Sequence, residues 1–264
     1  MKCYLGVIWF EEFLLNKVRI DKLLVERGLT SSRERAQALI LAGRVLVDEQ
    51  KVEKSGTAVD GSAVIRLLGE GIRYVSRGGL KLEHALAHWQ IDVRGATCMD
   101  VGASTGGFTD CLLQHGAALV LAVDTGYGQI DARLRGDKRV RLLEKTNARY
   151  LEAAQVPERI ALIAMDVSFI SATLVLPAVV RAAFAGKAAA RQEAVILVKP
   201  QFEAGRQQVG KGGIVRDPEA QQFAVERVRG AVAELGATGI EVTESPIFGA
   251  EGNREFLLHC MFHL

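Results

Sequence analysis

The sequence predicts an α/β fold in which a large doubly wound sheet follows a small α+β module. Three observations lead to this prediction. The length of 264 residues is enough for about two domains. Short helix and strand patterns fill the first quarter of the chain. Apolar strands then alternate with helices to the end, which is typical of a parallel sheet covered by helices.

The composition is that of a folded protein, because 49% hydrophobic and 24% charged residues exclude a disordered chain. Four scattered cysteines predict reduced, mostly buried thiols, and neither a zinc site nor a disulfide framework. Residues 1–16 begin as an apolar leader that Glu11 and Glu12 interrupt. No apolar run reaches the roughly 18 residues of a membrane span. We therefore expect a cytoplasmic protein with an N-terminal extension over residues 1–16.

Residues 17–68 form the predicted α+β module. The segment RIDKLLVERGL has apolar residues at helical spacing and ends near Gly28, and SSRERAQALILAG predicts a second helix that ends at Gly43. The segments RVLVDEQ and AVIRLL are typical of short strands, and the turn-rich KSGTAVDGS separates them. Residues 69–80 are expected to link this module to a second domain over residues 81–264.

The second domain is predicted to begin with the helix LKLEHALAHW and the strand TCMDVG. A helix near Gly107, the strand LVLAVDTG, an arginine-rich helix or loop and the strand IALIAMDVS follow. Next come the helix ISATLVLPAVVRAAF, the strand EAVILVKPQF, a long helix capped by Asp217 with Pro218 in its first turn, and two closing strands. Ligands of such sheets bind at the carboxyl ends of the strands, so we expect the chemistry just after Asp100, Asp124, Asp166 and Lys199.

The segment MDVGASTGGFTD, residues 99–110, is the strongest local motif. Its glycines allow backbone N–H groups to approach a ligand, and a helix that starts near Gly107 favours an anionic group. Asp124 ends the next strand, where a carboxylate can accept hydrogen bonds from ribose hydroxyls. Ser104 replaces the second glycine of a dinucleotide-binding motif, which favours S-adenosylmethionine as the cofactor. The alternative is a tight strand-to-helix turn without a ligand.

The candidate catalytic residues are Lys81, Asp166, Lys199 and Glu255. Asp166 and Lys199 end strands that are otherwise apolar, and a charge in such a place is costly unless it is paired or used. A lysine in a partly dry cleft, beside a carboxylate and a second ammonium, can act as a general base toward a weakly acidic ribose hydroxyl. The alternative is a structural ion-pair network at the top of the sheet.

The net charge of +2 is unevenly distributed. Residues 17–54 and 131–149 carry surpluses of three and four positive charges, and residues 217–255 carry a surplus of five negative charges. Basic segments suit contact with a nucleic-acid backbone, although a solvated helix face is the alternative. The candidate RNA-binding residues of the module are Arg19, Lys22, Arg33, Arg35 and Arg44.

The segment GRQQVGKG, residues 205–212, nearly matches a phosphate-binding loop of nucleotide hydrolases. Gly212 stands where that motif has its hydroxyl residue, and neither an apolar strand before it nor a helix after it is predicted. We therefore interpret the segment as a mobile loop that shapes a substrate cleft.

Several long motifs together resemble the TlyA family, namely RIDKLLVERGLTSSRERAQALILAGRVLVD, YVSRGGLKL, DVGASTGGFTD, MDVSFIS, LVKPQFE, KGGIVRD and GNREFLL. The resemblance covers nearly the whole chain from about Arg19. It implies an S4 RNA-binding domain at residues 17–68, joined to a Rossmann-like methyltransferase domain similar to FtsJ. The implied activity is S-adenosylmethionine-dependent 2′-O-methylation of a cytidine in ribosomal RNA within a ribosomal subunit, without a metal. The end of the chain resembles the shorter family form, which implies 23S rRNA.

The resemblance also implies roles for the candidate residues. Lys199 would be the general base, Asp166 and Lys81 would tune and orient it, and Glu255 would organise the substrate side. Cofactor contacts would come from Gly102, Ser104, Thr105, Gly106, Gly107, Asp124 and Asn147. Two alternative functions are a membrane-active haemolysin, a name historically attached to this family, and a non-catalytic RNA-binding factor of ribosome assembly.

Overall fold

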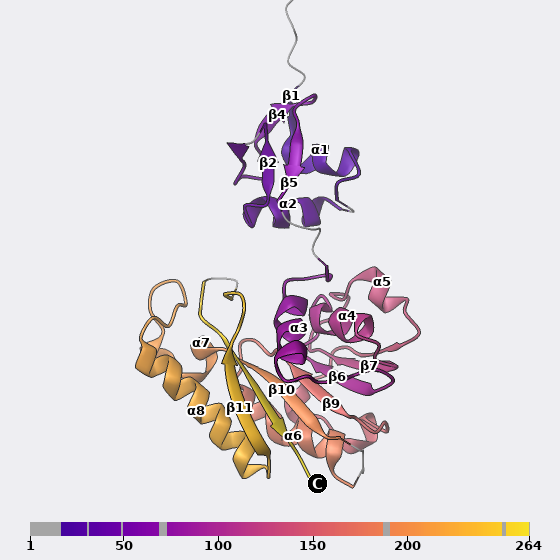
Figure 1. The fold of residues 1–264 in the computed structure, drawn as a ribbon, viewed down its shortest axis with the longest axis vertical. Coiled ribbons are helices and arrows are strands. Elements are labelled where there is room, and N and C mark those ends of the chain that lie inside the picture. Colours follow the sequence, from indigo (N-terminus) through magenta and orange to yellow (C-terminus); the bar gives the residue numbers. More distant parts are fainter. Residues whose placement is uncertain are drawn as a thin grey trace, which may run out of the picture. The chain divides into compact units, whose positions relative to one another are not determined.

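The computed structural model describes residues 17–30, 32–48, 50–68, 73–186, 191–249 and 252–263. The chain divides into two compact units, Met1–Ile72 and Arg73–Leu264, which we call the first and the second unit (Figure 1). The expected N-terminal extension, residues 1–16, and the beginning of the expected linker, residues 69–72, lie outside the described residues.

The described residues of the first unit form two helices and five short strands, as an α+β module should. The helices are α1 (Ile20–Glu26) and α2 (Arg33–Leu41). The strands form an antiparallel pair and a three-stranded antiparallel sheet, made of β1 (Lys17–Arg19) with β4 (Ala58–Asp60), and of β3 (Gln50–Lys51), β2 (Val45–Val47) and β5 (Ile65–Leu67).

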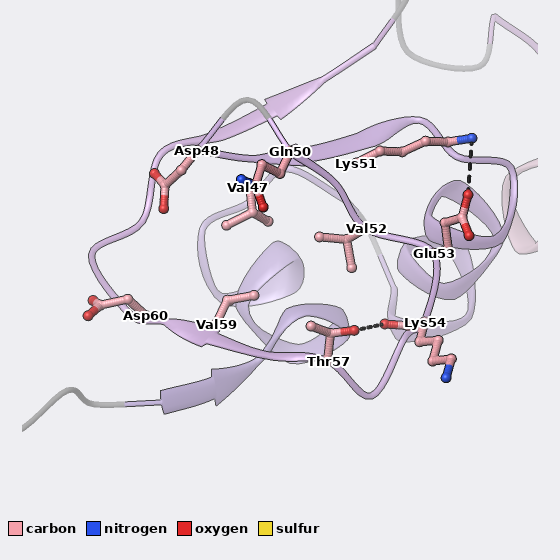
Figure 2. Close-up of a pocket in the computed structure, with 10 residues that line it drawn as sticks. All are labelled: Val47, Asp48, Gln50, Lys51, Val52, Glu53, Lys54, Thr57, Val59 and Asp60. Atoms are coloured by element: carbon pink, nitrogen blue, oxygen red, sulfur yellow. Dashed lines mark hydrogen bonds and ion pairs between the residues drawn. The ribbon is translucent and has the colours of Figure 1, made fainter.

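Apolar residues from both helices form the core of the first unit. Ile20 and Leu24 of α1 and Ile40 of α2 are fully buried and pack with Val45. Helix α2 starts where the Ser32 hydroxyl accepts a hydrogen bond from the Arg35 backbone N–H, a common cap. Figure 2 shows a pocket of about 670 Å³ in this unit; none of the candidate RNA-binding residues lines it.

The second unit is built on a seven-stranded sheet in the order β11-β12-β10-β9-β6-β7-β8. The five strands from β10 to β8 in this order are parallel, and β12 pairs antiparallel with both of its neighbours. The strands are β6 (Thr97–Val101), β7 (Leu119–Val123), β8 (Val140–Leu143), β9 (Leu162–Met165), β10 (Glu193–Val198), β11 (Thr238–Glu244) and β12 (Phe256–Met261).

Helices connect these strands, as the alternating pattern predicts. Helix α3 begins at Gly78, two residues before the expected start at Leu80, and β8 lies in the arginine-rich segment for which the sequence predicts a helix or loop. The helices are α3 (Gly78–His88), α4 (Gly107–Gln114), α5 (Ala132–Arg135), α6 (Ala172–Phe184), α7 (Pro200–Glu203) and α8 (Pro218–Glu234). Short 3₁₀ turns lie at η1 (Ala148–Tyr150), η2 (Ala153–Gln155) and η3 (Arg206–Gln208).

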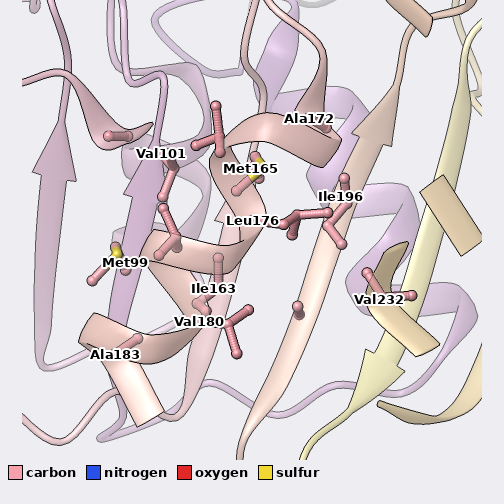
Figure 3. Close-up of a cluster of buried hydrophobic side chains, with 14 of the residues drawn as sticks. Met99, Val101, Ile163, Met165, Ala172, Leu176, Val180, Ala183, Ile196 and Val232 are labelled. Carbon is pink, nitrogen blue, oxygen red and sulfur yellow. The ribbon is translucent and has the colours of Figure 1, made fainter. Parts of the chain in front are cut away.

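Alternate residues of each central strand face two separate cores. Met99 and Val101 of β6 pack with α6 and α8 on one face, where Figure 3 shows Leu176 and Val232. Cys98 of the same strand belongs to the core on the other face, together with residues of α3 and α4. A parallel sheet covered on both faces has continuously apolar strands, so its charged residues are confined to the strand ends.

Two expectations concern the chain as a whole. Cys98, Cys111 and Cys260 are free and buried, as their scattered spacing predicts, and Cys3 lies outside the described residues. Within the part of the chain that the structure describes, no helix is both long enough and apolar enough to cross a membrane.

Candidate active site

The ends of four adjacent strands bring the predicted residues together. In the sheet, β10, β9, β6 and β7 are consecutive neighbours. They are followed directly by Lys199, Asp166, Gly102 and Asp124. The carboxyl ends of parallel strands share one edge of the sheet, so these four residues lie along a single crevice, where ligands of this fold class bind.

The four candidate catalytic residues form two ion pairs. Lys199 Nζ lies 2.6 Å from Asp166 Oδ1 and also donates a hydrogen bond of 2.6 Å to the Ser168 hydroxyl. Lys81, which lies in α3, donates a hydrogen bond from Nζ to Oε2 of Glu255, the residue that precedes β12. The side chain of Asp166 is 21% exposed and that of Glu255 is 3% exposed. Solvent therefore reaches the first pair more readily than the second.

A cavity of about 180 Å³ opens beside these ion pairs. Lys81, Asp166 and Lys199 line it, whereas Glu255 contacts Lys81 without lining the cavity. Four predicted cofactor-binding residues line the same cavity, namely Gly102, Ser104, Thr105 and Gly107.

The turn between β6 and α4 owes its shape to left-handed backbone. Gly102 has φ of +87°, Ser104 +49° and Gly106 +95°. A Cβ atom on Gly102 would lie 2.5 Å from the carbonyl oxygen of Asp166, so no side chain fits there. Gly106 lines neither this cavity nor a second, larger one beside it. A Cβ atom on Gly106 would collide with Leu134. The glycines therefore allow the turn to pass close to Asp166 at the end of β9 and to Leu134 of α5.

A second cavity, of about 470 Å³, continues from the first. Both cavities share Gly102, Ser104, Asp166 and Ser168. The larger one is also lined by the predicted cofactor-binding residues Asp124 and Asn147. Together they place the candidate catalytic residues and the candidate ribose-binding carboxylate on adjoining cavities.

Asp124 is held in place by backbone N–H groups at the start of the larger cavity. Its Oδ2 accepts a hydrogen bond from Ser104 N at 2.8 Å, and its Oδ1 accepts one from Gly126 N at 2.6 Å. Each carboxylate oxygen has a further lone pair, so Asp124 can still accept hydrogen bonds from a ligand. The Asn147 side chain accepts from Arg149 N at 3.1 Å and caps η1.

Asp100 is a site residue that the sequence reasoning did not select. It lines the smaller cavity and is fully buried, and its Oδ2 accepts hydrogen bonds from the Thr109 backbone and hydroxyl at 2.8 and 2.6 Å. Among the described residues its Oδ1 has no hydrogen-bond partner. Burial raises the pKa of Asp100 to about 7, and the nearby negative charge of Asp166 contributes. Its position at the end of β6 was the only signal in the sequence.

The raised pKa of Asp100 predicts a pH-dependent stability. Below pH 4 the carboxyl is protonated in both the folded and the unfolded chain, and between about 4 and 7 only the folded chain keeps the proton. The folded state therefore loses stability as pH rises, by up to about 1.4 kcal/mol per pH unit. We expect the free energy of unfolding of the wild type to fall relative to Asp100→Asn between pH 5 and 7. Urea unfolding of both proteins checks this; parallel pH profiles would contradict it.

The candidate RNA-binding residues lie in the first unit, and two of them share a carboxylate partner. Arg19 and Arg33 form ion pairs of 2.9 and 3.0 Å with the fully buried carboxylate of Asp21. The hydrogen bond from Arg19 is the main reason why the pKa of Asp21 is held well below its usual range. Lys22 pairs with Glu26 on the surface of α1, and Arg44 is half-buried beyond α2. Arg35 is half-buried in the first turn of α2.

Comparison with known proteins relates both units to described families. Residues 74–262 match the FtsJ-like methyltransferase family, and residues 18–65 match the S4 domain. The chain is 45% identical over 246 residues to the 16S/23S rRNA (cytidine-2′-O)-methyltransferase TlyA of Mycobacterium tuberculosis, which spans 93% of this chain and 90% of that protein.

Two further similarities carry a different name. The chain is 40% identical over 243 residues to Hemolysin A of Brachyspira hyodysenteriae, across 92% of this chain and 99% of that protein. A solved structure of a hemolysin candidate from Streptococcus thermophilus matches with a TM-score of 0.72 and 42% identity, across 94% of this chain and 89% of that one. Proteins called methyltransferase and proteins called hemolysin are thus similar to the same two units.

Proposed function

The chain belongs to the FtsJ-like methyltransferase family and carries an S4 domain, and from this premise we propose that it methylates the 2′-hydroxyl of a cytidine in ribosomal RNA. The methyl donor would be S-adenosylmethionine. The relative from Mycobacterium tuberculosis bears the name of this activity at 45% identity. The observation that carries the proposal is the Lys199–Asp166 ion pair, which borders the cavity where the turn after β6 would hold the donor.

The residues of the two cavities fit S-adenosylmethionine. The larger cavity offers the Asp124 carboxylate for a ribose, and Asn147 for the adenine side. The smaller cavity offers Asp100, whose buried Oδ1 has no partner among the described residues and could accept a hydrogen bond from the ammonium of the methionine part. Gly102 brings the backbone close between them. When bound, the cofactor supplies an electrophilic methyl group.

Lys199 is the residue that would remove the proton from the ribose hydroxyl. In its amine form, Nζ would accept the hydroxyl proton as the oxygen takes the methyl group, whose bond to the sulfonium sulfur breaks so that the thioether leaves. Asp166, at 2.6 Å, then stabilises the ammonium, and the Ser168 hydroxyl fixes its orientation. The buried Lys81–Glu255 pair keeps a second ammonium beside the cavity, where negative charge develops on the oxygen.

The proposed function is tested by methyl transfer to intact ribosomal subunits. Purified protein is incubated with S-adenosylmethionine labelled in its methyl group and with 30S or 50S subunits that lack the modification. We expect label in ribosomal RNA; label in the 50S subunit alone would agree with the 23S target that the sequence analysis expects. No label in either subunit would contradict the proposal and favour a factor that only binds RNA.

Phe169 is an aromatic residue at the mouth of the larger cavity that the sequence reasoning also missed. Its side chain is 93% exposed, and its φ of +63° is unusual for a bulky residue. The ring centroid lies 5.6 Å from that of Phe202, which follows Lys199 by three residues. Exposed aromatic rings bind unstacked bases, so we propose that Phe169 stacks on the base of the target nucleotide.

Phe169→Ala should therefore impair methylation through the RNA. A lost stacking contact is worth about 1 to 3 kcal/mol, so kcat/KM for the subunit should fall by roughly 5- to 150-fold. Phe169→Tyr should stay close to the wild type, and so should Phe223→Ala, which removes an exposed ring from α8. Cofactor affinity is measured in parallel by calorimetry. If Phe169→Ala methylated the subunit as fast as Phe223→Ala, the stacking role would be wrong.

A further inference from the structure

The loop between α7 and α8 carries a cluster of cations next to the catalytic lysine in sequence. It follows Lys199 and α7, and Arg206, Lys211 and Arg216 are all exposed. Among the described residues, none of these three side chains has an ion-pair or hydrogen-bond partner. The segment from Ala204 to Arg216 also contains no acidic residue. Three uncompensated positive charges therefore project from one short loop.

Four of the five arginines in the segment 131–149 do have carboxylate partners, although the sequence makes that segment even more basic. Arg133 pairs with Asp131, Arg135 with Glu144, Arg139 with Asp137 and Arg141 with Glu158, at distances of 2.5 to 3.0 Å. An arginine that already holds a carboxylate has less capacity for a phosphate. Four arginines of this segment are thus already engaged with carboxylates, whereas none of the three cations of the loop has a carboxylate partner among the described residues.

The loop is anchored to the strand that begins beside the catalytic glutamate. Asn253 is 1% exposed; its side chain accepts a hydrogen bond from Val215 N and donates one to Gly213 O, both at 2.9 Å. Glu255 follows two residues later. Figure 1 shows this loop and the loop between β11 and β12 rising from the same end of the second unit. The loop is therefore connected to the candidate catalytic residues at both of its ends. Its first residues follow Lys199 and α7, and its last residues are hydrogen-bonded to Asn253, two positions before Glu255.

The turn within the loop is fixed by its own backbone. Gly210 N donates to Ile214 O at 3.0 Å, and Gly212 and Gly213 have φ of +79° and +74°. Val215 is buried in a small apolar cluster with Ala204 and Ala220. These contacts hold the chain while leaving the long cationic side chains in solvent.

We propose that Arg206, Lys211 and Arg216 bind backbone phosphates of the RNA beside the target nucleotide. This inference rests on the proposed function, because the loop adjoins the proposed general base. Two guanidinium groups can each bind a phosphate through two parallel hydrogen bonds, and the lysine adds a point charge. Such contacts position the RNA without reading its sequence. The second unit would then hold the RNA independently of the S4 domain.

The test compares two triple variants of the full-length protein that remove the same charge. The loop variant is R206Q/K211Q/R216Q, and the control is R159Q/R181Q/R229Q, which removes three cations from other surfaces of the second unit. Binding to transcribed 23S rRNA is measured between about 0.05 and 0.3 M KCl. For the loop variant we expect an affinity at least about tenfold weaker and a slope of log Kd against log salt lower by about 2 to 3. The control should match the wild type.

A conservative variant separates charge from folding. R206K/R216K keeps all three charges and should retain most of the affinity, and unchanged binding of S-adenosylmethionine verifies that the site is intact. Equal affinity and equal salt slope for the loop variant and the control would overturn the proposal. If the wild type failed to methylate subunits but the loop variant still lost RNA affinity, only the proposed function would fail. If the wild type methylated subunits and the loop variant bound normally, only the loop proposal would fail.

Discussion

Replacing Lys199 by methionine is expected to slow methyl transfer by roughly 10²- to 10⁴-fold, the usual contribution of a general base. Methionine has nearly the length of lysine but cannot accept the proton of the ribose hydroxyl. Asp166 then loses its partner at 2.6 Å, although at 21% exposure it can still be hydrated. The affinity for S-adenosylmethionine, measured by calorimetry, should change little, because Lys199 is not needed to hold the adenosine end.

Two comparison variants make this prediction specific. Lys199→Arg keeps a positive charge beside Asp166 but cannot be deprotonated at neutral pH, so it should be nearly as inactive as Lys199→Met. Arg159→Met removes an exposed cation outside both basic segments and should leave turnover unchanged. If Lys199→Arg retained turnover within about threefold of the wild type, positive charge alone would suffice and the base role would be wrong.

Gly102→Ala is expected to have the largest effect on the architecture of the site. A left-handed alanine costs about 1 to 2 kcal/mol, and an atom forced into packed surroundings about 1 to 3 kcal/mol more, so we expect a loss of about 2 to 5 kcal/mol. The new Cβ atom would lie 2.5 Å from the Asp166 carbonyl oxygen and 3.2 Å from Val167 Cα, both of which belong to the backbone. Relief of this collision moves Asp166, so the affinity for the cofactor and the transfer rate should both fall.

Gly95→Ala is the matched control for the Gly102 variant. Gly95 has φ of +69°, but no atom lies within 4 Å of a Cβ atom placed there. Alanine at this position should cost only the backbone strain, about 1 to 2 kcal/mol. Urea unfolding of the second unit and calorimetric titration with S-adenosylmethionine compare the two. Equal stability and equal cofactor affinity for both variants would show that close approach at Gly102 is unimportant.

The sequence predicts the central strands well because they are buried on both faces. Strands β6, β7, β9 and β10 are nearly uninterrupted apolar segments, and a charged residue or glycine marks where each ends. Strand β8 escaped prediction because it lies at the edge of the sheet. It has four half-buried residues and includes Arg141, whose charge is neutralised by Glu158. Edge strands lack the apolar pattern that burial imposes on central ones.

Topology determines which of the candidate catalytic residues pair, and the sequence does not encode this locally. Lys81 and Glu255 are 174 positions apart, and they meet because β12 inserts between β10 and β11. The charge pattern of the sequence likewise does not show which cations are already paired with carboxylates. The sequence shows the basic segment 131–149 but not that four of its arginines have carboxylate partners. Asp100 was also overlooked, because its burial and the hydrogen bonds that Thr109 of α4 donates to its Oδ2 depend on tertiary packing.

The chemical identity of the methylated nucleoside tests the central claim most directly. Subunits treated with wild-type protein and S-adenosylmethionine are deproteinised, their RNA is digested to nucleosides, and the products are separated by mass spectrometry. We predict 2′-O-methylcytidine with the wild type and none with Lys199→Met. A methyl group on the cytosine base, or 2′-O-methylcytidine formed equally by Lys199→Met, would contradict a Lys199–Asp166 pair that activates a ribose hydroxyl.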